Sequence, residues 1–179
     1  IRELEWLHRV QGLELYWREH ATCPTESEYA DMVVHKTGGL FRVALCLMDS
    51  VADSDAAPFV PLANLLGLLF QIRDDYLNLQ PPSACDDITE GKFSFPLIHA
   101  VRAAKDATLL TMLQQHTQDP ALKQQAVAYM QDVTNSFAYT RDVWHALHTQ
   151  TRTEIERLER TWGENTAMHR LLDALRIRA

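Results

Sequence analysis

The chain has 179 residues, a formal net charge of −7 and a hydrophobic content of 46%. This length suits one domain with its own core, and the composition excludes a disordered or membrane-spanning chain. The acidic balance disfavours nucleic acid and anionic membranes as partners, because basic surfaces bind both. The three scattered cysteines have no disulfide or metal-ligand spacing, which is typical of a reducing compartment. We therefore expect one cytoplasmic domain without a membrane span.

Hydrophobic periodicity predicts an all-α fold, and only 6 Gly and 7 Pro are present to form the tight turns of a β fold. A first helix is expected to stop near His20. Its apolar surface should come largely from four residues, Leu4, Leu7, Leu13 and Trp17.

A second helix should begin at Thr25, because Thr25 and Glu28 have the spacing of a capping box. This helix reaches the Gly38-Gly39 pair, which permits either a break or a close approach to another segment. A helical pattern resumes over 40–51.

A central helix is predicted over about 61–79 and should end before Pro81. Its apolar residues point in almost every direction around the axis, which indicates a helix surrounded by others. An acidic loop through Asp86 and Asp87 should follow. Further helices are predicted near 97–104, 107–115, 121–133, 136–159 and 166–177.

Four polar residues, Gln71, Asp74, Asp75 and Asn78, form a stripe along the central helix at offsets 0, 3, 4 and 7. Two carboxylates in an apolar setting need a cation or hydrogen-bond donors to stay ionised. Oxygen ligands on one helix face suit Mg²⁺ shared with substrate phosphates. The alternative from the stripe alone is that Arg73 and other bases pair with the aspartates near the surface.

Two lysines lie beside glycines in separate segments. Lys36 and Thr37 precede the glycine pair, and Lys92 follows Gly91. Either lysine alone is compatible with an ordinary surface residue, and the chain has no GxxxxGK[ST] phosphate-binding loop. Together with the two aspartates, they predict a metal and diphosphate site.

Five segments in the same order, GLELYWREH, HKTGGLFRVALCLM, LGLLFQIRDDYLNLQ, DDITEGKFSFPLIHAVR and TNSFAYT, resemble the trans-isoprenyl diphosphate synthase family. Within it they are similar to the fungal type of geranylgeranyl diphosphate synthase. The resemblance covers about residues 1–145. FQIRDDYLN followed by TEGKFSFP is the most specific part.

The resemblance implies an isoprenoid synthase helical bundle that condenses an allylic diphosphate with isopentenyl diphosphate, making geranylgeranyl diphosphate. It also implies Mg²⁺ as the cofactor and a homo-oligomer built from dimers. By resemblance, Asp74, Asp75 and Asn78 hold the metal. Lys36, Thr37, Gln71 and Lys92 serve the allylic diphosphate, and Phe70 faces the hydrocarbon.

Nothing in the chain matches the family's first aspartate-rich motif. We therefore expect residues 1–179 to form one partial domain that lacks the N-terminal helices and is inactive alone. Two alternatives stay open at this point. One is a non-catalytic or regulatory subunit that associates with a complete synthase, and the other is a terpene cyclase of the same fold.

Overall fold

The computed structural model describes residues 2–52, 55–80, 85–104 and 107–177. Within these ranges every regular element is helical, so the all-α fold class is confirmed. The helices are α1 (Arg2–Glu19), α2 (Glu26–Ala52), α3 (Val60–Asn78), α4 (Asp86–Glu90), α5 (Phe95–Ala103), α6 (Thr108–Gln114), α7 (Pro120–Ala128), α8 (Ser136–Trp162) and α9 (Thr166–Ala174). A 3₁₀ turn (Ala57–Phe59) precedes α3, and a π-helical turn (Tyr129–Val133) continues α7.

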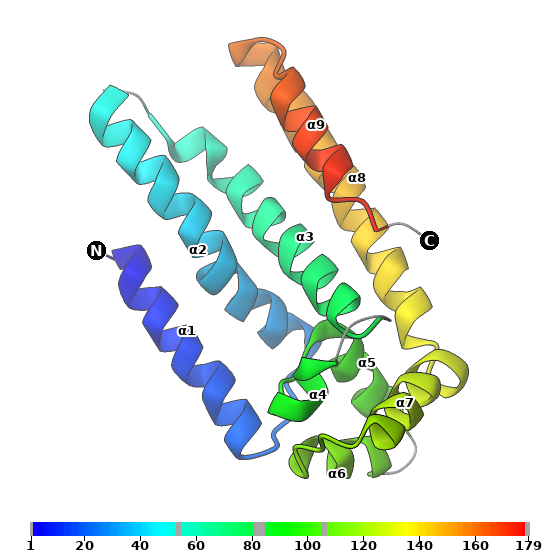
Figure 1. Ribbon diagram of the computed structural model, residues 1–179. Helices are drawn as coiled ribbons and strands as arrows, with labels where there is room; N and C mark the ends of the chain where they lie inside the picture. Colours follow the sequence, from blue (N-terminus) through cyan, green and yellow to red (C-terminus); the bar gives the residue numbers. More distant parts are fainter. Residues whose placement is uncertain (1, 53–54, 81–84, 105–106, 178–179) are drawn as a thin grey trace.

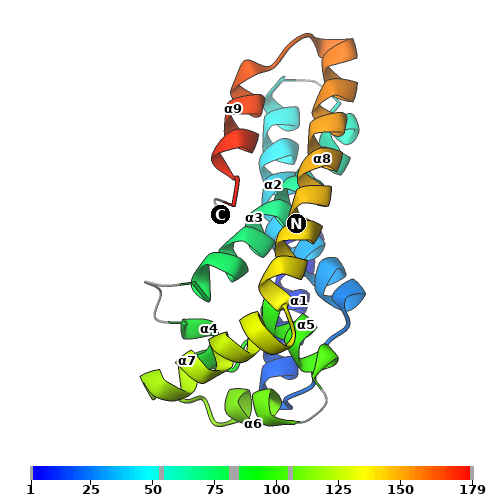
Figure 2. The same ribbon diagram turned by 90° about the vertical axis from the view of Figure 1, so that its right-hand side faces the viewer.

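The four long helices lie in a row, with α1 against α2, α2 against α3 and α3 against α8 (Figure 1). The short helix α9 folds back along α8. Helices α4 to α7 gather at one end of the row, where α5 contacts α2, α3 and α8 (Figure 2). This arrangement brings the C-terminal end of α3 next to the segment that carries α4 and Lys92.

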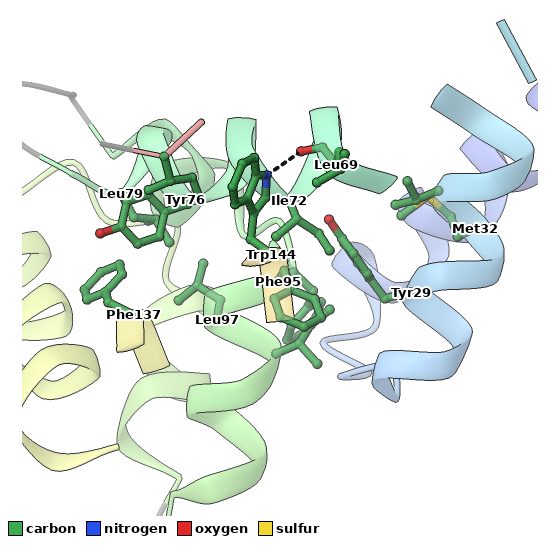
Figure 3. Close-up of a cluster of buried hydrophobic side chains, with 14 of the residues drawn as sticks. Tyr29, Met32, Leu69, Ile72, Tyr76, Leu79, Phe95, Leu97, Phe137 and Trp144 are labelled. Carbon is green, nitrogen blue, oxygen red and sulfur yellow. Dashed lines mark hydrogen bonds between the residues drawn. The ribbon is translucent and has the colours of Figure 1, made fainter. Parts of the chain in front are cut away.

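The main core lies where α2, α3, α5 and α8 meet (Figure 3). Trp144 is fully buried there and donates a hydrogen bond from its indole Nε1 to the carbonyl oxygen of Leu69, at 3.2 Å. Four other aromatic rings from several helices are part of the same core cluster. They belong to Tyr29, Tyr76, Phe95 and Phe137. Burial of these large side chains fixes the position of α3 relative to α5.

The start of α2 confirms the predicted capping box. The amide nitrogen of Glu28 donates to the Thr25 hydroxyl at 3.1 Å, and the Thr25 amide donates back to the Glu28 carboxylate at 2.7 Å. Of the two possibilities at Gly38-Gly39, the close approach is correct, because α2 continues through the glycines without a break.

Two local expectations were wrong. Asp86 and Asp87 begin the short helix α4 rather than lying in a loop. In α1 the buried residues are Val10 and Trp17, whereas Leu4 and Leu13 are exposed. The predicted stop at Pro81 falls outside the described residues.

Helix α3 is not covered on every side within the described part of the chain. Phe70, Asp74 and Leu77 are exposed, and their spacing of four and three residues places them on one face of the helix. The opposite residues, including Leu69 and Ile72, are buried. None of the described helices is long and apolar enough to span a membrane.

Candidate functional site

A cavity of about 330 Å³ lies where α1, α2, the end of α3 and the segment around α4 come together. Its walls are mostly polar or charged. The lining residues are Gln11, Glu14, Leu15 and Arg18 from α1, Lys36 from α2, Asp74 and Asn78 from α3, and Asp87, Glu90 and Lys92 from the following segment. Lys36, Lys92 and Asp74 thus line the same cavity.

Asp75 lies beneath this cavity and is completely buried. Its Oδ2 accepts hydrogen bonds from the Tyr29 hydroxyl at 2.6 Å and from the Phe95 amide at 2.9 Å. Its Oδ1 accepts from Gln71 Nε2 at 2.9 Å and from Lys92 Nζ at 3.1 Å. Because a carboxylate has about four lone-pair positions, these donors occupy the whole group. Asp75 as placed here has no oxygen lone pair left for a metal ion.

Lys92 is held between two carboxylates. Its Nζ lies 3.1 Å from Asp75 Oδ1 and 3.2 Å from Asp87 Oδ1. The two negative charges raise the pKa of Lys92 despite its burial, so this ammonium stays charged. Burial raises the pKa of Asp87 to about 6, with Lys92 opposing the shift and Asp75 adding to it. The other oxygen of Asp87 is buried, and the geometry of the described residues gives it no hydrogen bond.

Lys36 is paired with Glu14 of α1. The next residue, Thr37, donates from its hydroxyl to Gln71 Oε1 at 2.9 Å. Gln71 in turn donates to Asp75, so a chain of hydrogen bonds joins the Lys36–Thr37 turn to the Asp75 network. This chain fixes the relative positions of α2 and α3 at the cavity floor.

Asp74 differs from Asp75 in every respect that matters for metal binding. It is exposed, it lines the cavity, and no hydrogen bond or ion pair within the described ranges engages its carboxylate. The described residues contain no group of three or more Asp, Glu, His or Cys side chains placed to hold an ion by themselves. One free carboxylate beside a lysine-lined cavity fits Mg²⁺, which commonly takes one or two protein carboxylates and completes its shell with water and phosphate oxygens.

The predicted site residues therefore differ in where they lie relative to the cavity. Lys36, Lys92, Asp74 and Asn78 line the cavity. Thr37 and Gln71 lie behind it in the hydrogen-bond chain, and Asp75 holds that chain together. Phe70 is exposed on the open face of α3, outside the cavity. Asn78 accepts a hydrogen bond from the Asp87 amide at 3.2 Å.

The cavity wall that α1 supplies was not predicted from the sequence. Gln11, Glu14, Leu15 and Arg18 stand at offsets 0, 3, 4 and 7, the same spacing that singled out the stripe on α3. These offsets in α1 were a sequence signal that could have predicted this wall of the cavity. Asp87 was noticed only as part of an acidic segment, and nothing in its local sequence predicts that it is buried beside Lys92.

The family model described as polyprenyl synthetase matches residues 2–130. The chain belongs to the polyprenyl synthetase family. The match extends from α1 into the π-helical turn and includes every residue that lines the cavity.

Individual relatives agree with this assignment. The geranylgeranyl pyrophosphate synthase janG of Penicillium janthinellum is 47% identical over 96% of this chain and 48% of its own length. Geranylgeranyl pyrophosphate synthase 1 of Zymoseptoria tritici is 46% identical over 98% of this chain and 55% of its own length. The IDS-like terpene synthase 1 of Melampsora lini is 47% identical over 87% of this chain and 50% of its own length. The chain thus spans about half the length of these curated relatives.

Proposed function

We propose that this chain supplies the diphosphate-binding wall of a prenyltransferase. The complete protein would condense an allylic diphosphate with isopentenyl diphosphate and form geranylgeranyl diphosphate. The observation that carries the proposal is the convergence of Lys36 and Lys92, from separate segments, on one cavity that also exposes the Asp74 carboxylate. The names of the relatives support the choice of substrate and product.

The two lysines have a defined role in this reaction. When the bond between the allylic carbon and the diphosphate breaks, negative charge grows on the leaving group. Ammonium groups fixed beside it stabilise that charge more strongly than water does, because they need little reorganisation. Asp75 contributes by holding Lys92 in place through its 3.1 Å contact, and Gln71 links Asp75 to Thr37.

Mg²⁺ is the cofactor that we propose, with Asp74 as its ligand from this chain and Asn78 beside it on the cavity wall. When bound together with the diphosphate, the ion would neutralise part of the leaving group's charge. Asp75 is not included among the proposed ligands, because four donors already surround its carboxylate.

The two alternative functions make different use of the same wall. A terpene cyclase of this fold would also ionise an allylic diphosphate here, and the Melampsora lini relative is named a terpene synthase. A regulatory subunit would keep the wall but not turn substrate over. We favour the prenyltransferase because the relatives named as geranylgeranyl pyrophosphate synthases cover 96% and 98% of this chain. The complete protein is further proposed to be a homo-oligomer built from dimers.

A direct test measures prenyl transfer by the complete protein from radiolabelled isopentenyl diphosphate and farnesyl diphosphate. The Lys92→Ala variant should lose roughly a hundredfold or more in kcat/KM, since one charged contact to the leaving group disappears. Arg160→Ala is the matched control, because Arg160 is an exposed cation in the last turn of α8, at the far end of the molecule (Figure 1). Product without incorporated label would favour the cyclase, and full activity of Lys92→Ala would contradict the proposed site.

A further inference from the structure

Both lysines of the proposed diphosphate site are already engaged by carboxylates, but the two ion pairs are built differently. Lys92 faces Asp75 and Asp87, whose side chains are 0% and 5% exposed. Lys36 faces Glu14, and these two side chains are 29% and 15% exposed. The Lys36 pair therefore remains in contact with solvent at the cavity surface.

The freedom of the carboxylates differs in the same way. Asp75 is held by donors from α2, α3 and the start of α5, so it cannot leave Lys92 without breaking several buried hydrogen bonds. Lys36 is the side-chain partner found for Glu14 among the described residues. A rotation of the Glu14 side chain about its own bonds would release Lys36 while α1 stays in place. Glu14 is thus the displaceable partner.

Charge in the cavity makes this displacement relevant to an incoming anion. The lining contains four acidic residues, Glu14, Asp74, Asp87 and Glu90, against three basic ones, Arg18, Lys36 and Lys92. An anion that entered this cavity would meet Glu14 directly beside the ammonium it needs. At such short range, like charges disfavour binding, and the partly dry setting strengthens the effect.

We propose that Glu14 is an internal counter-ion that competes with the diphosphate for Lys36. Glu14 positions the Lys36 ammonium before substrate binds, and the diphosphate then replaces Glu14 as the partner of Lys36. Glu14 therefore sets the affinity of the cavity for the diphosphate group. This inference rests on the proposed function and adds to it a residue that belongs to neither the lysines nor the aspartates of α3.

The experiment measures binding of inorganic pyrophosphate to the 179-residue chain by isothermal titration calorimetry, with chelator present and at constant ionic strength. Competition predicts that Glu14→Gln binds pyrophosphate about three- to tenfold more tightly than the unaltered chain, the scale of a partly exposed ion pair. A residue with a merely structural role would weaken binding when changed. In a Lys36→Ala background, Glu14→Gln should tighten pyrophosphate binding by less than it does in the unaltered chain, because only the direct repulsion between Glu14 and the anion is then removed.

Glu5→Gln is the matched control. Glu5 lies on the same helix and forms an ion pair with Arg9, but both side chains are more than half exposed and neither lines the cavity. Its removal should leave pyrophosphate affinity unchanged. A second variant, Glu14→Asp, keeps the charge on a shorter side chain and should bind with affinity between those of Glu14→Gln and the unaltered chain.

The outcomes are distinguishable. Equal or weaker binding by Glu14→Gln, while the unaltered chain binds pyrophosphate, would overturn the role of Glu14 and leave the proposed function intact. Binding by none of the variants would overturn the diphosphate site itself and Glu14's role with it. Loss of the helical circular dichroism signal in both Glu14 variants would also overturn the proposal, since a displaceable counter-ion is not needed for folding.

Discussion

Gly38 of α2 and Gly67 of α3 meet backbone to backbone. A Cβ atom added to Gly67 would lie 2.6 Å from the Gly38 amide nitrogen and 2.7 Å from its Cα. Real Cβ atoms do not approach backbone this closely, so the contact requires glycine at position 67. The contact brings α2 and α3 together one residue after Thr37, which bonds to Gln71 of the site.

We therefore expect Gly67→Ala to destabilise the chain by about 1–3 kcal/mol, because the methyl group must push two helices apart. Urea unfolding followed by circular dichroism measures the change. Gly12→Ala is the control, since nothing lies within 4 Å of a Cβ at that position in the middle of α1. That change should stabilise by roughly 0.5–1 kcal/mol through helix propensity alone. Equal effects at the two glycines would show that the close approach is not present in solution.

The neighbouring aspartates of α3 should respond differently to the same substitution, Asp75 mainly through stability and Asp74 mainly through turnover. Asp75→Asn should lower the free energy of unfolding by about 3 kcal/mol or more, because it removes one carboxylate from a buried charge network around Lys92. Asp74→Asn should change stability by less than about 0.5 kcal/mol, since Asp74 is exposed and unpaired within the described residues. In the complete protein, Asp74→Asn should still reduce turnover about a hundredfold.

Two measurements separate these roles, urea unfolding for stability and radiolabelled prenyl transfer for turnover. Asp132→Asn is a suitable control because Asp132 is also an exposed helical aspartate but does not line the cavity. An Asp75→Asn variant as stable as the unaltered chain would contradict the structural role of Asp75. A fully active Asp74→Asn variant would contradict the proposed role of Asp74 in turnover.

The cysteines should react at very different rates with iodoacetamide. Burial raises the pKa of the Cys23 thiol to about 11, against an opposing effect of Arg102, and burial also raises the pKa of Cys85. Only the thiolate reacts, so at pH 8 roughly one Cys23 in a thousand would be reactive. Cys46 is exposed and should be alkylated first.

Peptide mass spectrometry over time resolves the three sites. Cys23 should become reactive only as the pH rises toward 11, because its folded-state pKa lies above the usual value for a thiol. Cys46→Ser should abolish the fast phase. Rapid alkylation of Cys23 at pH 8 in the folded chain would show that this thiol is not shielded by α5 and the start of α2.

Local sequence determined most of the secondary structure. The Thr25–Glu28 capping box acts over four residues, and the apolar run between Pro61 and Pro81 located α3 within one residue at each end. Helix α4 was not predicted, because its five residues are too few to show a helical period of apolar residues. Lys36, Lys92 and Asp74 were first selected by their residue types and neighbours in the sequence, the family resemblance then assigned their roles, and all three line one cavity.

Only the tertiary structure distinguished Asp74 from Asp75. The two residues are adjacent and chemically identical, but successive side chains of an α-helix point about 100° apart. One carboxylate therefore faces the cavity, while the other meets donors from α2 and the start of α5, which lie 46 and 20 residues away in the sequence. Glu14 likewise meets Lys36 only because α1 packs on α2. A sequence pattern places residues on a helix, and the packing of helices decides what each side chain contacts.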